Sequence, residues 1–254
     1  MRVDHRDPWF RRYRVDGARV RLVCFPHAGG AATSYLGWPQ LLPEGVEMLA
    51  VQYPGRQSRI AEPCFESLPE LATAVTVALK AHSDLPLTLF GHSMGSAIAY
   101  EVARALRQDG REVPRLLVSG RGSPHVGYGD RRPPGLDDRS LIAVVRALSG
   151  SDADAYEHPE MRDLLMPSLR ADYTMLDRYR PTAPAEPLDV PVTVFGGEDD
   201  PACPVSELAS WAHVTSAGCE VLTYPGGHFY LREHERALVA EVARRLPVRK
   251  GPAA

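Results

Sequence analysis

The chain has 254 residues, of which 44% are hydrophobic and 24% are charged, so its composition excludes wholesale disorder. Its formal net charge of −3 gives no reason to expect nucleic acid as a partner. Segment 1–15 lacks the apolar core of a secretory signal, and no run approaches the roughly 18 apolar residues that a membrane span needs. We therefore expect a cytoplasmic, monomeric protein that binds neither membranes nor nucleic acid.

Short β-branched apolar runs alternate with longer helical patterns along the chain. The sequence predicts strands at Val20–Phe25, Met48–Tyr53, Leu87–Phe90, Arg115–Ser119, Val190–Phe195 and Glu220–Tyr224. It predicts helices at Leu68–Ala81, Ser96–Arg107, Ser206–Val214 and Glu233–Leu246. Such alternation is typical of βαβ crossovers, and it predicts an α/β fold with a mostly parallel sheet and helices on both faces. We expect one domain over residues 1–254.

One interval, between the predicted strands that end at Ser119 and begin at Val190, is too long for a single crossover helix. Helical patterns lie within it at Ser140–Leu148 and Glu160–Tyr179, and Pro167 should kink the second. That second pattern carries an apolar stripe of Met161, Leu164, Leu165, Leu169, Tyr173 and Leu176. Residues 123–187 are therefore expected to form an insertion. The insertion is expected to be a helical subdomain packed on the body, a lid over a substrate, or both at once.

The sharpest local signal is Gly91-His92-Ser93-Met94-Gly95, which matches G-x-S-x-G between a predicted strand and a predicted helix. This context is that of a nucleophile elbow, in which the serine backbone is strained into positive φ and the glycines leave room for the close approach of strand and helix. Ser93 is therefore the expected nucleophile. The alternative is a plain serine in a tight turn.

A serine hydroxyl needs a base, and the chain contains nine histidines. His228 follows the predicted strand Glu220–Tyr224 in a Pro-Gly-Gly loop, at the sheet edge where α/β sites assemble. We expect His228 to be the base and His92 to have a packing role. The contexts of His5, His82 and His234 predict surface positions.

The base in turn needs an acid, and Glu198, Asp199 and Asp200 follow the predicted strand Val190–Phe195. Asp200, which precedes Pro201, is the preferred acid; Asp199 is the second choice, and Glu198 is expected to be solvated. The order Ser93, Asp200, His228 along the chain is the order of α/β-hydrolases.

An oxyanion hole needs two backbone N–H donors, of which one should come from Met94, directly after the nucleophile. The other should come from the small-residue loop Phe25–Gly30, where Ala28 is preferred and His27 is second. The alternative is that the glycines of this loop only shape a turn.

These residues resemble one family, the type II editing thioesterases of polyketide and nonribosomal peptide synthesis. The resemblance covers Val20 to Leu246 and rests on blocks that begin at Phe25, Tyr53, Phe90, Pro167, Phe195 and Gly226. The most discriminating blocks are Pro54-Gly-Arg56 and Leu169-Arg-Ala-Asp172, whereas the loop Gly127–Gly135 departs from the pattern.

The resemblance implies an α/β-hydrolase fold with a helical lid, and hydrolysis of acyl thioesters from the phosphopantetheine arm of acyl or peptidyl carrier proteins. It implies a triad of Ser93, Asp200 and His228, and an oxyanion hole of the Ala28 and Met94 amides. No cofactor or metal is indicated. The residues expected to contact the substrate are His27, Met161, Leu165, Tyr173 and Phe229.

Three other functions stay open: a carboxylesterase or lipase on the same scaffold, a non-catalytic carrier-binding protein, and acyl transfer to an alcohol or amine. Arg56 and Arg59 are expected in internal ion pairs, with Arg170 and Asp172 anchoring the lid helix. A sharper hypothesis is that Arg56 or Arg59 helps orient the pantetheine phosphate or an acidic carrier surface. The dispersed cysteines predict free thiols rather than a zinc site: Cys24, Cys64, Cys203 and Cys219.

Overall fold

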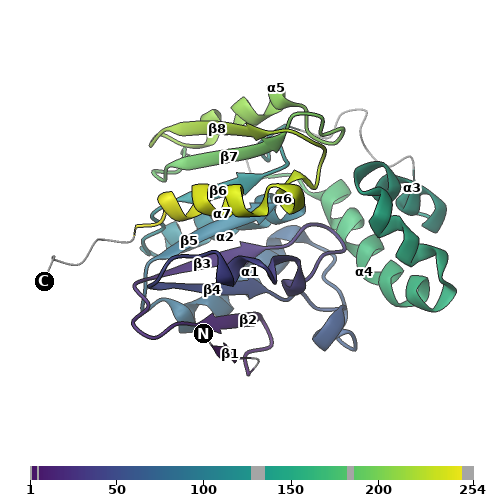
Figure 1. Ribbon diagram of the computed structural model, residues 1–254, viewed down its shortest axis with the longest axis horizontal. Coiled ribbons are helices and arrows are strands. Elements are labelled where there is room, and N and C mark those ends of the chain that lie inside the picture. The colour runs from purple at the N-terminus through teal and green to yellow at the C-terminus, as the bar shows by residue number, and fades with distance from the viewer. Residues whose placement is uncertain (1, 5, 127–134, 182–185, 248–254) are drawn as a thin grey trace, which may run out of the picture.

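The computed structural model describes residues 2–4, 6–126, 135–181 and 186–247. Its centre is an eight-stranded sheet of order β1-β2-β4-β3-β5-β6-β7-β8 (Figure 1). The strands are β1 Arg2–Asp4, β2 Phe10–Arg14, β3 Val20–Phe25, β4 Val46–Val51, β5 Leu87–His92, β6 Leu116–Ser119, β7 Val192–Gly197 and β8 Cys219–Tyr224. Strands β3 to β8 are parallel, and β1 and β2 add an antiparallel edge. The predicted parallel sheet is confirmed, and this is an α/β-hydrolase fold.

The sequence analysis missed β1 and β2. In β2 only Phe10 and Tyr13 are buried, so the strand lacks the alternation of period two that identifies a half-buried strand. Arginines at Arg11, Arg12 and Arg14 make the segment appear polar. Its pairing with β4, and not its own pattern, makes it a strand.

Helices cover both faces of the sheet because its central strands are apolar on both sides. In β3, Val23 and Phe25 belong to one buried cluster, which also contains residues of α1 Leu68–Leu79 and α2 Met94–Gln108. Leu22 and Cys24 belong to a second cluster with α7 Glu235–Arg244. The predicted helices 206–214 and 233–246 are each divided, into α5 Val205–Leu208 with the 3-10 helix η7 Ala209–Val214, and into α6 Tyr230–Glu233 with α7.

The predicted insertion contains α3 Asp138–Leu148, the 3-10 helix η6 Gly150–Glu157 and α4 Pro159–Arg178. Figure 1 shows α3 and α4 together at one end of the strands, on the side away from the C-terminus. The helix α4 continues through Pro167, which therefore does not end it. Parts of the expected insertion 123–187 and of the loop Gly127–Gly135 lie outside the described residues.

Three further expectations from the sequence have definite outcomes. All four cysteines are free thiols, as predicted. The surface prediction for His82 is wrong: the side chain is buried, its Nε2 lies 2.8 Å from Asp7 Oδ2, and its ring packs edge-on against Phe10. Within the described ranges, every helix is too short or too polar to cross a membrane.

Candidate active site

The backbone at Ser93 has the strained geometry of a nucleophile elbow. Ser93 has φ 55° and ψ −117° between the end of β5 at His92 and the start of α2 at Met94. A Cβ on Gly91 would lie 2.2 Å from the Gly95 carbonyl oxygen, and one on Gly95 would lie 2.0 Å from that of Phe25. No side chain fits at such distances, so both glycines are required sterically. The predicted positive φ is confirmed.

His228 and Asp200 meet at the carboxyl ends of β8 and β7. The imidazole Nδ1 lies 2.8 Å from Asp200 Oδ2, and both side chains are buried. Asp200 Oδ1 also accepts the backbone N–H groups of Ala202 and Cys203, at 2.8 and 3.3 Å. Because an ionised carboxylate only accepts hydrogen bonds, Nδ1 carries the proton and Nε2 is left as the acceptor.

The structure distinguishes Asp200 from the two other acidic residues of its turn. Glu198 and Asp199 are exposed, whereas Asp200 is 4% exposed. The turn is closed by the backbone, with the Asp199 N–H donating to the Gly226 carbonyl at 3.0 Å. This contact joins the β7 turn to the loop that carries His228, so Asp200 and His228 are held by the same pair of loops.

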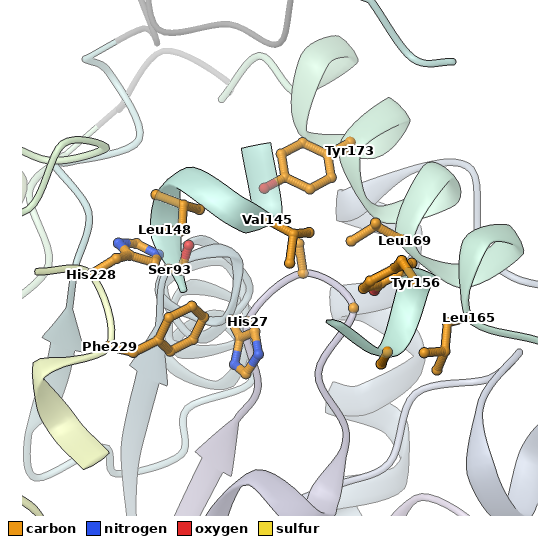
Figure 2. A pocket seen from close by; sticks show the side chains of 13 residues that line it. His27, Ser93, Val145, Leu148, Tyr156, Leu165, Leu169, Tyr173, His228 and Phe229 are labelled. Carbon is orange, nitrogen blue, oxygen red and sulfur yellow. The ribbon is translucent and has the colours of Figure 1, made fainter. Parts of the chain in front are cut away.

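Ser93 and His228 line one cavity. Figure 2 shows the Ser93 hydroxyl directed toward the His228 ring, with Phe229 and His27 beside them. Ser93 is supplied by the β5–α2 elbow, and its N–H donates to the Ser119 carbonyl at 2.7 Å. The three side chains expected to act together therefore lie at one edge of the sheet although they are far apart in the sequence.

His92 packs behind this group, as predicted. Its ring is fully buried, its centroid lies 4.9 Å from that of His228, and its Nδ1 lies 2.9 Å from Ser119 Oγ. Burial, and then the charges of His228, His27 and Arg232, lower the pKa of His92 well below its ordinary value. The ring is therefore neutral at pH 7, and its role is to pack against the His228 ring.

The expected oxyanion loop lies against the start of α2. Ala28 lines the cavity, and Gly29 has φ 74°, a conformation that favours glycine. Met94 is the first residue of α2, so its N–H has no acceptor within the helix. The Gly30 N–H donates to the His27 carbonyl at 2.9 Å, which closes the turn around Ala28. The His27 ring faces the cavity and packs edge-on against Phe229.

The cavity has a volume of about 330 Å³. The sheet side contributes polar groups, whereas the insertion contributes apolar side chains and two tyrosines (Figure 2). The lining residues from the insertion are Val145, Leu148, Ala155, Tyr156, Leu165, Leu169 and Tyr173.

Four of the five side chains expected to contact substrate line this cavity: His27, Leu165, Tyr173 and Phe229. The fifth, Met161, does not line it and is 42% exposed. Met161 continues the apolar stripe of α4, but the first turn of that helix is exposed and burial begins only at Met166. Met161, a candidate for contact with the substrate or for the lid, thus lies on the insertion helix but outside the cavity lining, because helical periodicity does not tell where a helix leaves the body that it covers.

The sequence analysis missed Val145 and Leu148 of α3 and Tyr156 of η6. A usable signal was present for two of them, since Leu141, Val145 and Leu148 have the spacing of one helix face. For Tyr156 no periodic signal existed, because it lies in an irregular 3-10 segment.

The internal role of the arginines is confirmed. Arg56 is 5% exposed and forms a bidentate ion pair with the buried carboxylate of Asp172. Arg59 is 7% exposed and bonds to Glu62 and to the Gln52 carbonyl. Neither lines the cavity that contains Ser93. Arg170 pairs with Asp138 and donates to the Leu136 carbonyl, which links α4 to the start of α3.

A metal centre has no basis in the described part of the chain, where no group of three or more His, Cys, Asp or Glu side chains is placed to hold an ion.

Comparison with known proteins identifies close relatives. The profile of the thioesterase domain matches residues 20–247. The chain is 41% identical over 248 residues to the thioesterase PikA5 of Streptomyces venezuelae, covering 96% of this chain and 87% of that protein. The solved structure of the type II thioesterase BorB, from the borrelidin biosynthetic cluster, superposes with a TM-score of 0.85 at 36% identity, covering 95% and 99% of the two chains. That of the RedJ thioesterase, from the prodiginine pathway of Streptomyces coelicolor, does so with a TM-score of 0.82 at 38% identity, covering 90% and 86%.

Proposed function

This chain belongs to the thioesterase domain family, and from that premise we propose that it hydrolyses acyl groups from the phosphopantetheine arm of carrier proteins. Its relatives include type II thioesterases of polyketide and nonribosomal peptide biosynthesis. The proposed role is therefore editing: the release of aberrant or stalled acyl groups from a synthase. The proposed partners are acyl or peptidyl carrier domains, and the proposed compartment is the cytoplasm.

The proposed roles follow the geometry of the sheet edge. Ser93 is the nucleophile, His228 is the base that removes its proton, and Asp200 holds the imidazole in the tautomer that leaves Nε2 toward the serine. The N–H groups of Ala28 and Met94 are the proposed donors to the oxyanion. Because Met94 opens α2, its N–H also lies at the positive end of the helix dipole.

The proposed reaction has two steps. Ser93 Oγ attacks the thioester carbonyl while His228 takes its proton, and the tetrahedral oxyanion collapses with cleavage of the C–S bond. The departing pantetheine thiolate takes up that proton from His228, so the imidazole is neutral again. Water, deprotonated by the same imidazole, then cleaves the acyl-enzyme and regenerates Ser93. A thiol has an ordinary pKa near 8.5, so it leaves as a thiolate more readily than an alkoxide leaves from an ester. These steps need neither a cofactor nor a metal.

The cavity supports an apolar acyl chain as the substrate. Leu148, Val145 and Leu169 face the space beyond Ser93 (Figure 2), so a chain bound through its carbonyl at the elbow extends along apolar side chains. The observation that carries the proposal is the hydrogen bond between His228 and Asp200 beside an elbow serine that lines this cavity.

The test is mass spectrometry of a panel of acyl-carrier proteins after incubation with the wild type or with Ser93→Ala. We expect the wild type to convert acyl carriers to free carrier, and Ser93→Ala to leave them loaded. Oxygen esters of the same acyl chains serve as the second substrate series. Higher kcat/KM on the esters would instead identify a carboxylesterase, and equal turnover by both proteins would contradict the assignment of the nucleophile.

A further inference from the structure

The insertion reaches the proposed oxyanion loop through one buried carboxylate. Asp172 of α4 is fully buried, and its Oδ2 accepts the N–H of Gly29 at 2.8 Å. Gly29 directly follows Ala28, whose N–H is the proposed donor to the oxyanion. A charged group on the insertion thus lies one peptide unit from an atom that the proposed reaction uses.

Arg56 holds that carboxylate in place. Its Nη1 and Nη2 lie 2.5 and 2.8 Å from the two Asp172 oxygens, and Nη1 also donates to the Gly30 carbonyl at 3.2 Å. Burial lowers the pKa of Arg56, but the charge and the hydrogen bonds of Asp172, with smaller contributions from Cys64 and Tyr53, together raise it above its ordinary value. The pair therefore remains ionised, and it holds both the N–H of Gly29 and the carbonyl of Gly30.

The other side of the loop is anchored to the body. The Tyr53 hydroxyl donates to the Pro26 carbonyl at 3.2 Å, and that of Tyr35 donates to the Phe25 carbonyl at 2.7 Å. Ala28 thus lies between one anchor on the body, at Pro26, and one on the insertion, at Gly29. Displacing Asp172 would release the second anchor without touching the first.

The helix that supplies Asp172 also lines the cavity. Leu169 and Tyr173 precede and follow it on α4, and both face the cavity (Figure 2). Leu169 also packs on the loop itself, since a Cβ on Gly29 would lie 2.9 Å from Leu169 Cδ1. An acyl chain that contacts Leu169 and Tyr173 therefore contacts the same helix, α4, whose Asp172 accepts the N–H of Gly29.

We propose that Asp172, held by Arg56, is a positioning residue that sets the Ala28 N–H of the oxyanion hole and couples it to the cavity for the acyl chain. This inference rests on the proposed thioester hydrolysis. If the inference holds, the Arg56–Asp172 ion pair affects the rate of the chemical step. An ion pair that only stabilises the fold would leave that rate unchanged. Substrate binding energy far from the carbonyl then contributes to kcat.

A matched control is available at the opposite end of the strands. Glu47 of β4 is buried and pairs with Arg12, at 3.0 Å, and with Arg21. It does not line the cavity. Glu47→Gln therefore disturbs a buried ion pair to a comparable degree without touching the loop at Ala28.

The experiment compares the wild type, Asp172→Asn and Glu47→Gln on acetyl- and octanoyl-pantetheine. For Asp172→Asn we expect kcat on octanoyl-pantetheine to fall by about 10- to 100-fold, less than the roughly 100- to 1,000-fold loss on removal of an oxyanion donor. The KM and the pH profile of kcat/KM should stay near those of the wild type, because His228 and Asp200 are untouched. The octanoyl-to-acetyl ratio of kcat should also fall. Glu47→Gln should lower the melting temperature and leave kcat unchanged.

A double variant, Arg56→Met/Asp172→Leu, keeps the inference testable if Asp172→Asn unfolds. Replacing a buried ion pair by apolar side chains is often neutral for stability, so we expect a melting temperature near that of the wild type with the same loss of kcat. Wild-type kcat in either folded variant, or an equal loss in Glu47→Gln, would overturn the inference. An inactive wild type would instead refute the proposed function.

Discussion

The two walls of the cavity are held in different ways. On the sheet side, Ser93, Asp200 and His228 sit in turns closed by backbone hydrogen bonds above two large buried clusters. On the insertion side, α3, η6 and the middle of α4 share a small cluster whose buried members are Leu141, Tyr156, Met166 and Leu169. The C-terminal part of α4 joins the main cluster of the body through Met175 and Leu176. Preorganised catalytic groups need a rigid frame, whereas a wall that only selects an acyl chain can rest on fewer contacts. The difference teaches that the proposed triad lies in the more extensively packed region, whereas most side chains that line the acyl cavity, and Asp172 behind the oxyanion loop, come from the less packed one.

The largest effect on activity should come from substituting Asp200, the proposed acid on the sheet side of the cavity. Asp200→Asn removes the acceptor that fixes the His228 tautomer, and we expect kcat on acyl-pantetheine to fall by roughly 1,000- to 10,000-fold. Asp199→Asn changes the exposed neighbouring carboxylate and should leave kcat within about twofold of the wild type. Steady-state kinetics of the two folded variants measure this. A comparable loss in both would show that the turn, and not the Asp200 carboxylate, matters.

The next prediction compares how strongly a truncated leucine destabilises the body and the insertion. Leu106→Ala in α2 and Leu141→Ala in α3 each truncate a fully buried leucine. The first should lower the global free energy of unfolding by about 2–5 kcal/mol. The second should lower it less but speed hydrogen exchange in α3 and in the part of α4 before Met175, because Leu141 belongs to a small cluster whereas the end of α4 packs into the main one.

Urea unfolding together with hydrogen exchange followed by mass spectrometry distinguishes these outcomes. If Leu141→Ala lowers the global free energy of unfolding as much as Leu106→Ala does, the insertion and the body unfold as one unit and the comparison fails.

A smaller effect concerns selectivity. Leu165 lies at the part of the cavity farther from Ser93 (Figure 2), so Leu165→Trp should fill the space for the end of a long acyl chain. We expect kcat/KM on octanoyl-pantetheine to fall by about 10-fold, and that on acetyl-pantetheine to be unchanged. Leu164→Trp, at a 50% exposed position of the same helix, is the control and should change neither. Equal losses on both substrates would indicate a general disturbance of α4 instead.

The smallest effect is a pH dependence of stability that comes from His92, on the sheet side of the cavity. The native pKa of His92 is lowered well below 6.5, so between these values the unfolded chain binds a proton that the native protein does not. Stability therefore falls as the pH drops below 6.5, by at most about 1.4 kcal/mol per pH unit from this group.

His92→Gln should reduce that slope between pH 6.5 and 5, whereas His213→Gln, at an exposed position, should not. The measurement is the free energy of unfolding in urea at a series of pH values. An unchanged slope in His92→Gln would mean that other groups cause the acid sensitivity.

Prediction from the sequence succeeded where a residue's surroundings are close to it in the chain. The bounds of β3 are confirmed, and so is the positive φ at Ser93, because hydrophobic runs and the G-x-S-x-G turn are local patterns. Asp200 was preferred over Asp199 because it lies in the turn after the strand, directly before a proline. In the structure it is Asp200 that pairs with His228. Prediction failed for β2 and His82, whose pairing or burial depends on segments far away in the sequence.

The sequence by itself determined the parallel sheet, the strained elbow and the polar residues at the strand ends, because each follows from backbone sterics and from the periodicity of neighbouring residues. Only the tertiary structure decided which acyl-facing side chains line the cavity and that Asp172 of the insertion bonds to Gly29 beside the proposed oxyanion donor. Such contacts join segments more than a hundred residues apart, and their geometry depends on how whole helices pack.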